Sequence, residues 1–446
     1  MTTLFNTDPK GKIQCISFNG EGNVLMVTTK TKGAGYSLSN EKIEKKWVGP
    51  FKEGTIRGII PFYTSQIAIQ IGKGKSNWKT PTNEEMETKG NEEEQEEQEE
   101  SEYKVEKNKR IVARETTILS KKETTTNESK RWENANNIIK MFSLESKETF
   151  LNLKTMEEIV NIIPRLDYTF VMTLDKLHVI KTNNFQPTLH YLIQPPYNKK
   201  YGWEAMDIDE KNYNPVETIN SGIMDVSMAL NTKMEAYTAA ISAGEELKTK
   251  EAYTIAFQSS IKGKVDGATL GIIRHDAGKE ELYIVKDAHA HPIRKVAVSR
   301  EGQRIATCSI NGTLVIIRNI RKPLEKEIVF RRGTSTAEIY DLKFSPDGHY
   351  IAGASNSGTI HIWNIKDPKK NSKGLSYYLL DHPKAFAWYK GEAESPCILA
   401  WNIDEGGRYH LRIAYLNGKI RVITFDMEKG EDCKVVMERQ IHASAI

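Results

Sequence analysis

The chain has 446 residues, of which 39% are hydrophobic and 27% charged, so it is long enough to bury a large core. Its N-terminus lacks the basic start and apolar run of a secretory signal, and no stretch approaches the ~18 apolar residues of a membrane-spanning helix. We therefore expect any membrane contact to be peripheral.

The charge is unevenly distributed. Lysine and arginine number 63 and aspartate and glutamate 59, a net charge of +4. Residues Asn83–Arg131 hold 15 Glu against 10 Lys and Arg, a net charge of −5. The rest of the chain therefore has a net charge of +9 and is moderately basic. A basic body suits anionic partners such as nucleic acid or acidic lipid.

Strand-like runs recur outside that segment, between turn residues. Met156–Ile163 has a pattern that could suit a helix, but its β-branched residues favour a strand. Asn83–Arg131 has almost no aromatic residues and no sustained period, which predicts a disordered charged insertion. Its short apolar island, Ile111–Ala113 with Ile118-Leu119, could dock a partner or form only transient structure. The predicted strands are Ile13–Phe18, Val24–Thr28, Ile67–Ile71, Ile138–Phe142, Phe170–Leu174, Leu177–Ile180 and Leu282–Val285.

An internal repeat indicates the fold. Ile293–Thr313 aligns with Ile339–Thr359 at an offset of 46 residues, close to the ~40 to 45 residues of a four-stranded propeller blade. Weaker copies occur at Ile13–Leu38 and Leu411–Phe425. Without the insertion about 397 residues remain, enough for roughly seven blades. The sequence predicts an all-β, seven-bladed β-propeller of WD-repeat type spanning residues 1–446, with the insertion 83–131 in an early blade.

Two adjacent arginines are the sharpest local feature, in Phe330-Arg331-Arg332-Gly333-Thr334. Strand side chains alternate, so on an extended segment Arg331 and Arg332 point to opposite sides and would serve two different pockets. A guanidinium holds phosphate with a bidentate fork. The alternative is a surface pair that only makes salt bridges.

This motif resembles the PROPPIN family, the WD-repeat proteins interacting with phosphoinositides. Phe330–Thr334 followed by Ala337–Tyr340 matches the hallmark of that family, which generic WD-repeat proteins lack. Trp363 stands at the position of a WD signature, with Asn364 replacing the aspartate. Further matches are Ile16–Asn19, Ala288-His289 before Pro292-Ile293, Ala306–Ser309 before Gly312-Thr313, and Ser355 before Gly358–His361.

The resemblance implies two sites on the propeller rim for phosphatidylinositol 3-phosphate and phosphatidylinositol 3,5-bisphosphate. Hydroxyls and imidazoles would donate hydrogen bonds, and the arginines would supply charge. In the family, an arginine stands three residues after the threonine of the first site, which is Thr313 here. In this chain that position is Ile316, and Arg318 on the same strand face could replace the arginine. The first site would use His289, Ser309, Thr313 and Arg331, with Arg318 as the additional candidate, and the second site Arg332, Ser355, Thr359 and His361.

Family members also insert a long apolar loop of the sixth blade into the bilayer. The corresponding stretch, Lys366–Leu380, is short and basic. Its Lys369, Lys370, Lys373 and Leu375 would form the membrane-contact loop, with about 1 kcal/mol from each lysine near an anionic leaflet. Tyr377–Leu380 could equally be the next strand.

The resemblance implies a non-enzymatic, cytoplasmic protein that is recruited to preautophagosomal, endosomal or vacuolar membranes. Its partners would be phosphoinositide-containing membranes and autophagy lipid-transfer or conjugation-machinery proteins, and we expect a monomer in solution without nucleic acid. The chain lacks a phosphate-binding Gly loop, a Gly-x-Ser-x-Gly motif and metal-ligand spacing, so we expect no catalytic residues, metal or cofactor. The main alternative is a lipid-blind WD-repeat scaffold that only joins proteins.

Overall fold

The computed structural model describes the chain in segments, and the predicted insertion at 83–131 and the stretch Tyr377–Leu380 lie outside them. Within the described residues the chain is almost entirely β, with 29 strands and the short 3-10 helices η1 (Pro368–Asn371) and η2 (Ala443–Ala445), and no helix there is long and apolar enough to span a bilayer. The described residues are 2–5, 12–50, 56–61, 67–72, 138–144, 149–154, 159–165, 168–173, 176–181, 187–192, 223–228, 252–261, 264–276, 279–371 and 382–446.

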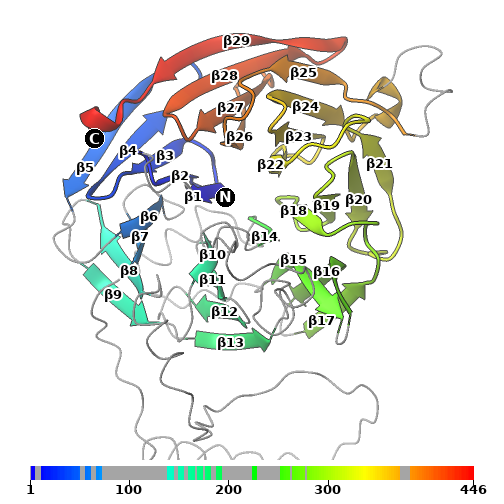
Figure 1. The fold of residues 1–446 in the computed structure, drawn as a ribbon, viewed down its shortest axis with the longest axis horizontal. Coiled ribbons are helices and arrows are strands. Elements are labelled where there is room, and N and C mark those ends of the chain that lie inside the picture. Colours follow the sequence, from blue (N-terminus) through cyan, green and yellow to red (C-terminus); the bar gives the residue numbers. More distant parts are fainter. Residues whose placement is uncertain are drawn as a thin grey trace, which may run out of the picture.

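The described strands form seven antiparallel blades around a central axis, which confirms the predicted β-propeller (Figure 1). Each blade has four strands in chain order from the axis outward, and the first has an additional inner strand. Blade 1 consists of β1 (Thr2–Phe5), β2 (Cys15–Phe18), β3 (Val24–Thr28), β4 (Lys32–Leu38) and β5 (Ile43–Pro50). Blade 2 consists of β6 (Ile56–Pro61), β7 (Ile67–Gly72), β8 (Ile138–Ser143) and β9 (Thr149–Lys154). Blade 3 consists of β10 (Ile159–Pro164), β11 (Tyr168–Thr173), β12 (Lys176–Lys181) and β13 (Pro187–Leu192).

The remaining blades contain the repeat found in the sequence. Blade 4 consists of β14 (Met224–Val226), β15 (Ala252–Ile261), β16 (Lys264–Asp276) and β17 (Lys279–Val285). Blade 5 consists of β18 (Ile293–Val298), β19 (Arg304–Ser309), β20 (Leu314–Asn319) and β21 (Ile328–Arg331). Blade 6 consists of β22 (Ile339–Phe344), β23 (Tyr350–Ser355), β24 (Thr359–Asn364) and β25 (Ala387–Lys390). Blade 7 consists of β26 (Cys397–Ile403), β27 (Tyr409–Tyr415), β28 (Lys419–Asp426) and β29 (Gly430–Gln440).

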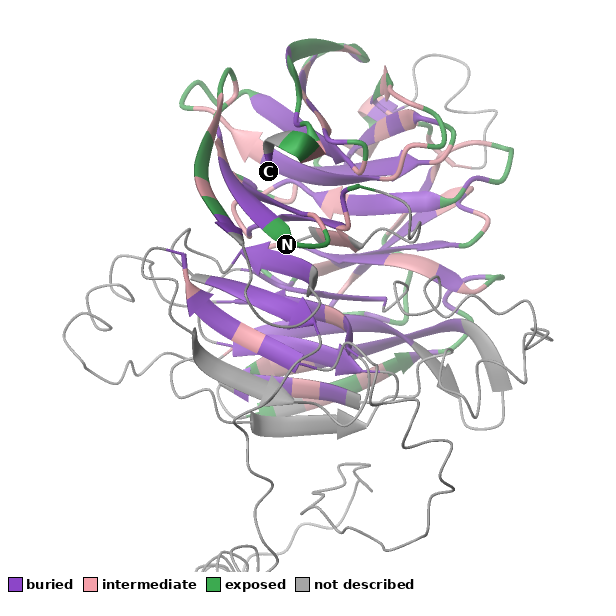
Figure 2. Cartoon of the chain, turned by 60° about the vertical axis from the view of Figure 1, so that its left-hand side comes forward, coloured by how far each residue is buried: buried purple, intermediate pink, exposed green. Residues whose placement is uncertain are grey.

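The predicted strands coincide with these elements to within a few residues, and Met156–Ile163 lies largely in strand β10, as its β-branched residues indicated. The four cysteines are free thiols, and three of them are buried. Buried residues follow the inner strands of each blade, whereas exposed residues gather at turns and outer strands (Figure 2).

Neighbouring blades share their hydrophobic cores. Val315, Ile317 and Phe330 of blade 5 pack with Leu342 and Trp363 of blade 6 in one cluster. The Phe330 and Trp363 rings lie 6.1 Å apart and nearly parallel. A blade thus buries each broad face only against a neighbour, so residues at the edge of such an interface come from two blades.

In the described residues, the first and last blades of the ring share no strand: β1 to β5 all belong to blade 1, and β26 to β29 to blade 7. Arg412 of β27 is 2% exposed and donates from Nη1 to the Gly22 carbonyl (3.0 Å) and from Nη2 to Asn40 Oδ1 (3.1 Å), both in blade 1. Blades 6 and 7 are joined further out, where β25 pairs with β29 in parallel. Arg412 is therefore a buried polar link between the last blade and the first, beside the hydrogen bond from Asn402 Nδ2 to Asn40 Oδ1 (3.2 Å).

Replacing Arg412 with Met should destabilise the fold by about 2 kcal/mol, because the Gly22 carbonyl and the Asn40 amide lose a buried charged donor. The matched control is Arg408→Met in the turn before β27, since the Arg408 side chain is 73% exposed and pairs with Asp404 at the surface. We expect the control to change stability by less than about 0.5 kcal/mol. Urea unfolding measures both, and equal stabilities would contradict this account of ring closure.

Candidate anion-binding site

The turn between the second and third strands has the same hydrogen bonds in blades 5, 6 and 7. The N–H of Gly312, Gly358 and Gly418 donates to the carbonyl of Ser309, Ser355 and Tyr415, each at 2.9 Å. All three glycines have positive φ, and a Cβ on Gly312 would lie 2.1 Å from the Ala337 carbonyl oxygen. Equivalent positions in these blades can therefore be compared directly.

The two arginines lie on opposite faces of blade 5. Phe330 packs in the core shared with blade 6, and alternation along the strand puts Arg332 on that face and Arg331 on the other. Arg331 pairs with Leu314 on β20. The Arg332 N–H donates to the Thr313 carbonyl of the first site at 2.8 Å, while its side chain belongs to the second site. This part of the chain physically connects the two sites.

The second site gathers residues from two blades. Ser355 ends β23, Thr359 starts β24, and His361 follows on the same face of β24 as Thr359. Arg332 reaches them from blade 5, and its charge is close enough to affect the imidazole of His361. The four residues predicted from the sequence are thus brought together at the interface of blades 5 and 6.

Arg332 has no acidic partner among the described residues. Its Nε donates to the Gly312 carbonyl (2.5 Å) and its Nη2 to the Ser335 carbonyl, and burial lowers the pKa of its guanidinium. By contrast, Arg294 at the same interface pairs with the Glu338 carboxylate. A half-buried guanidinium without a carboxylate favours an external anion, because its positive charge is not balanced nearby.

His361 shares this electrostatic environment. Burial and the charge of Arg332 lower its pKa to about 4. Its ring stacks on the buried indole of Trp363 at 5.6 Å. Ser355 Oγ lies 2.8 Å from Ser357 Oγ, so the hydroxyls are held near the turn. The site thus combines a cation with neutral donors, which is the chemistry that a phosphate monoester and its ring hydroxyls require.

The first site is more enclosed. His289 is 8% exposed, and its Nε2 lies 2.8 Å from Thr307 Oγ1. Burial and then the charge of Arg318 lower the pKa of His289 to about 3. Thr307 was not among the predicted site residues. Its position two residues before Ser309, on the same face of β19, is the signal that identifies it.

Arg318 is buried behind His289. It is 2% exposed, with Nη2 donating to the Ala288 carbonyl (3.0 Å) and Nη1 to Thr307 Oγ1 (3.4 Å), and burial lowers the pKa of its guanidinium to about 10. Ile316, on the same strand face, is 3% exposed. The structure therefore places Arg318 as a support for Thr307 and His289, with its charge directed into the protein.

The remaining residues of the first site lie at the rim of blade 5. Ser309 is buried at the end of β19, and Thr313 is half-buried in the turn before β20. Arg331, at the end of β21, is half-buried, and its N–H donates to the Pro383 carbonyl at 2.8 Å. These three positions occupy the same end of the blade, and His289 and Arg318 lie deeper.

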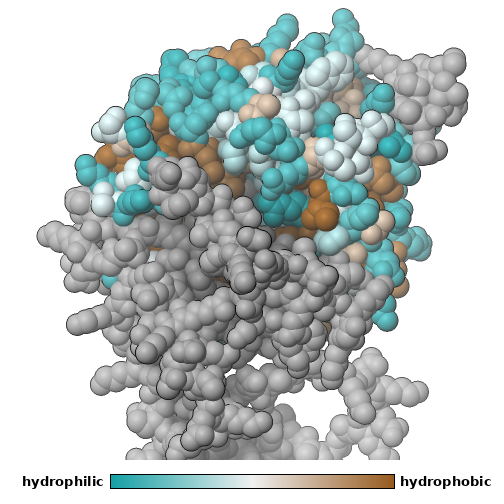
Figure 3. Space-filling view, in the orientation of Figure 1, coloured by the Kyte–Doolittle hydropathy of each residue, from teal (hydrophilic) through white to brown (hydrophobic). Residues whose placement is uncertain are grey.

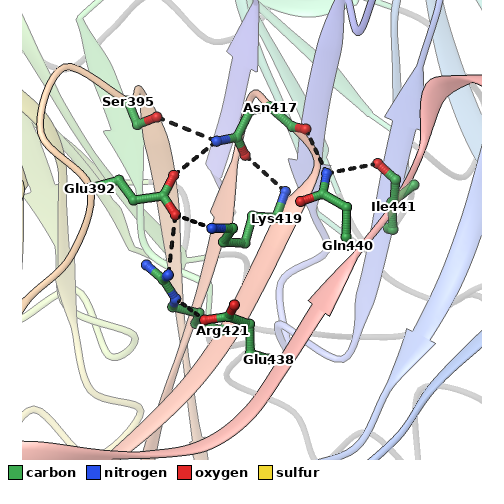
Figure 4. A network of polar contacts seen from close by, with 8 residues as sticks. All are labelled: Glu392, Ser395, Asn417, Lys419, Arg421, Glu438, Gln440 and Ile441. Carbon is green, nitrogen blue, oxygen red and sulfur yellow. Dashed lines mark hydrogen bonds and ion pairs between the residues drawn. The ribbon is translucent and has the colours of Figure 1, made fainter.

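The equivalent position between blades 6 and 7 is closed by internal ion pairs. Lys419 and Arg421 stand where blade 6 has Thr359 and His361. Figure 4 shows Glu392 between them, bonded to Lys419 Nζ, to Arg421 Nη2 (3.1 Å) and to Asn417 Nδ2 (2.9 Å). Burial raises the pKa of Glu392, but the hydrogen bonds from Lys419 and Asn417 outweigh it and hold the pKa below its usual value. Here a carboxylate pairs with the cations of the turn, whereas in the described residues no carboxylate pairs with Arg332 between blades 5 and 6.

The predicted membrane-contact loop is described only in part. Lys369 and Lys370 lie in η1, and Lys370 Nζ is 3.0 Å from Glu428 Oε2. Lys373 and Leu375 lie outside the described residues. Among the described residues no group of three or more His, Cys, Asp or Glu side chains could hold a metal ion.

Comparisons with known proteins agree with this architecture. Residues 280–318 and 326–364 match the model of the WD domain, G-beta repeat. The crystal structure of Kluyveromyces marxianus Hsv2 superposes with a TM-score of 0.58 at 12% identity, covering 97% of this chain and 100% of that one. The complex of Kluyveromyces lactis Atg21 with the coiled coil of Atg16 superposes with a TM-score of 0.59 at 14% identity, covering 96% and 98%. The chain is therefore a WD-repeat β-propeller.

Sequence relatives define the class further. SVP1-like protein 2 of Saccharomyces cerevisiae is 37% identical over 131 residues, which is 28% of this chain and 29% of the relative. Autophagy-related protein 18 of Eremothecium gossypii is 24% identical over 240 residues, covering 46% and 44%. The chain thus spans about half or less of the length of the curated relatives it matches. The chain is thus similar in sequence to SVP1-like and autophagy-related proteins over part of its length, and similar in fold to the Hsv2 and Atg21 structures.

The imidazoles of His289 and His361 should remain neutral well below pH 6.5 in the folded protein. Because an unfolded histidine binds a proton near pH 6.5, the stability contributed by neutral His289 and His361 is complete above that pH and falls as the pH drops towards 4. By pH 5 the free energy of unfolding should have fallen by about 1 to 2 kcal/mol for each histidine. Histidine NMR titrations, assigned with His289→Gln and His361→Gln, measure the two midpoints. Midpoints near the ordinary value of 6.5 would contradict the burial of the two histidines described above. Added inorganic phosphate should raise the midpoint of His361.

Proposed function

We propose that this protein recognises phosphoinositide head groups with the paired arginines Arg331 and Arg332 and is thereby recruited to membranes. The observation that carries the proposal is the second site. There, Arg332 has no carboxylate partner among the described residues and lies with His361, Thr359 and Ser355. An anionic phosphate would supply the missing negative charge, and the hydroxyls would serve the inositol ring.

The 3-phosphorylated phosphoinositides, phosphatidylinositol 3-phosphate and 3,5-bisphosphate, are the ligands that we propose. The basic remainder of the chain would favour approach to an anionic leaflet. The part of the surface visible in Figure 3 that is not grey is mostly hydrophilic, with apolar residues in small separate patches. Peripheral contact through charge and a few apolar side chains fits such a surface.

The biological setting that we propose is autophagosome formation or endosomal and vacuolar traffic, with the protein recruited from the cytoplasm. Relatives named as autophagy-related proteins support this setting. The Atg21 structure is a complex with a coiled coil of Atg16, so we propose a protein of the autophagy machinery as a further partner. The function is that of a non-enzymatic recruitment scaffold, and the alternative remains a scaffold that joins proteins without lipid.

Changing Arg331 and Arg332 together to Thr should abolish phosphoinositide-dependent binding, because both sites lose their cation. Sedimentation with liposomes that contain phosphatidylinositol 3-phosphate measures this, and a thermal melt checks that the variant remains folded. The matched control is Arg304→Thr in the same blade, whose guanidinium already pairs with Glu327. Unchanged sedimentation of the double variant would favour the lipid-blind scaffold.

The two sites should contribute unequally, with the second dominating. At the first site, Ile316 replaces a cationic donor, and Arg318 is bonded to protein atoms. Loss of one charge-assisted hydrogen bond costs about 1.5 to 3 kcal/mol, or roughly ten- to a hundred-fold in affinity. We therefore expect His361→Ala to weaken liposome binding severely and His289→Ala only mildly, with folding of both variants checked by thermal melts.

Calorimetric titration with the soluble head group removes membrane avidity, which could otherwise mask a weak site. One strong binding event for each chain is expected. Two equivalent events would show that the inequality is wrong and that the first site has another source of positive charge.

A further inference from the structure

The second site continues outward onto the next strand of its blade. In the register of β24 and β25, His361 pairs with Trp388 and Thr359 pairs with Lys390. Directly opposite residues in antiparallel strands share a face, with Cβ atoms about 4.5 to 5.5 Å apart. Trp388 and Lys390 therefore lie beside the two site residues, on the outermost strand of blade 6 (Figure 1).

Trp388 is exposed in a way that needs an explanation. Its exposed fraction is 41%, whereas Trp363 of the same blade and Trp401 of the next are 1% and 4% exposed. An indole combines a large apolar area with one polar N–H, so it prefers a boundary between water and an apolar phase. In membrane proteins, tryptophan is enriched at the level of the lipid head groups for this reason.

Lys390 is also exposed, and it makes no ion pair within the described part of the chain. Across the neighbouring interface, Lys419 and Arg421 pair with Glu392, and Arg421 pairs also with Glu438 (Figure 4). Lys390 is therefore available to an external anion. Together with Arg332 it places positive charge on the same side of blade 6 as the exposed indole.

One acidic residue opposes this arrangement. On the other side of β25, the parallel register pairs Trp388 with Asp432 of β29, which is exposed. Its carboxylate would repel an anionic surface and partly offset Lys390. The patch is therefore defined by Thr359, His361, Trp388 and Lys390, with Asp432 at its edge.

We propose that Trp388 and Lys390 extend the second site into a contact with the bilayer surface around a bound phosphoinositide. The indole enters the head-group layer, and the ammonium group pairs with neighbouring anionic lipid. Charge complementarity and continuity with the second site support a lipid bilayer as the occupant. This inference rests on the proposed function and adds residues that distinguish a membrane from a free head group.

The experiment compares liposomes with the soluble head group. Trp388→Ala should lower affinity for liposomes that contain phosphatidylinositol 3-phosphate roughly three- to ten-fold, and leave calorimetric affinity for soluble inositol 1,3-bisphosphate unchanged. Lys390→Gln should weaken binding mainly to vesicles that also contain phosphatidylserine, less so at high salt. Asp432→Asn should strengthen binding to the same vesicles. Val48→Ala on β5 of blade 1, 37% exposed, is the control and should bind like the wild type.

A lipid-quenching measurement provides an independent readout. Brominated phospholipid should quench part of the tryptophan fluorescence of the wild type on the vesicles, and Trp388→Phe should lose that part. Unchanged liposome affinity of Trp388→Ala, or an equal loss for the soluble head group, would overturn the inference while leaving the proposed function intact. Failure of the wild type itself to bind phosphoinositide liposomes would instead overturn the proposed function and the inference with it.

Discussion

A four-stranded blade has two broad apolar faces, and it can bury both only against neighbouring blades. This constraint shapes the whole molecule. Phe330 and Trp363, from adjacent blades, stack in a single core, and Arg412 fastens the last blade to the first. Because every core is shared, the interface between two blades is also where residues distant in the sequence meet at the rim. The candidate sites lie at such interfaces.

The three comparable turns show how one backbone geometry supports different chemistry. Between blades 5 and 6 the following blade supplies neutral donors, Thr359 and His361, and the preceding blade supplies Arg332. Between blades 6 and 7 the following blade supplies Lys419 and Arg421, which pair with Glu392 of the preceding segment, and Arg421 pairs also with Glu438. In the described residues, Arg332 between blades 5 and 6 therefore has no carboxylate partner, whereas Lys419 and Arg421 between blades 6 and 7 both have one. That difference, rather than the number of basic residues, separates a candidate anion site from a structural ion-pair network.

The candidate sites also differ in how far they are open to a ligand. Burial and adjacent guanidinium groups keep both histidines neutral, since Arg318 acts on His289 and Arg332 acts on His361. Arg318 is committed to protein acceptors, so its charge supports the architecture of the first site. Arg332 is only half-buried and bonds to backbone carbonyls, which a phosphate can replace as the partner. For the membrane recruitment that we propose, a second, weaker site beside the first would still add avidity.

Local chemistry explains why much of the fold could be predicted from the sequence. The 46-residue repeat, its turn glycines and the period-two alternation are properties of short segments, so they indicated the propeller, its number of blades and the opposite directions of Arg331 and Arg332. The family motif further implied which hydroxyl and histidine positions accompany each arginine. These inferences need no knowledge of distant contacts.

Only the tertiary structure decided what lies across an interface or on a neighbouring strand. The burial of Arg318 against Ala288 and Thr307 depends on how the segment before β18 folds over blade 5. The absence of a carboxylate beside Arg332 in the described residues, and its presence between Lys419 and Arg421, depend on which loops meet at each interface. The position of Trp388 opposite His361 depends on the register in which β25 pairs with β24. Such contacts join residues on different strands, from 11 to 30 positions apart in the case of Arg318, and local sequence patterns carry no information about them.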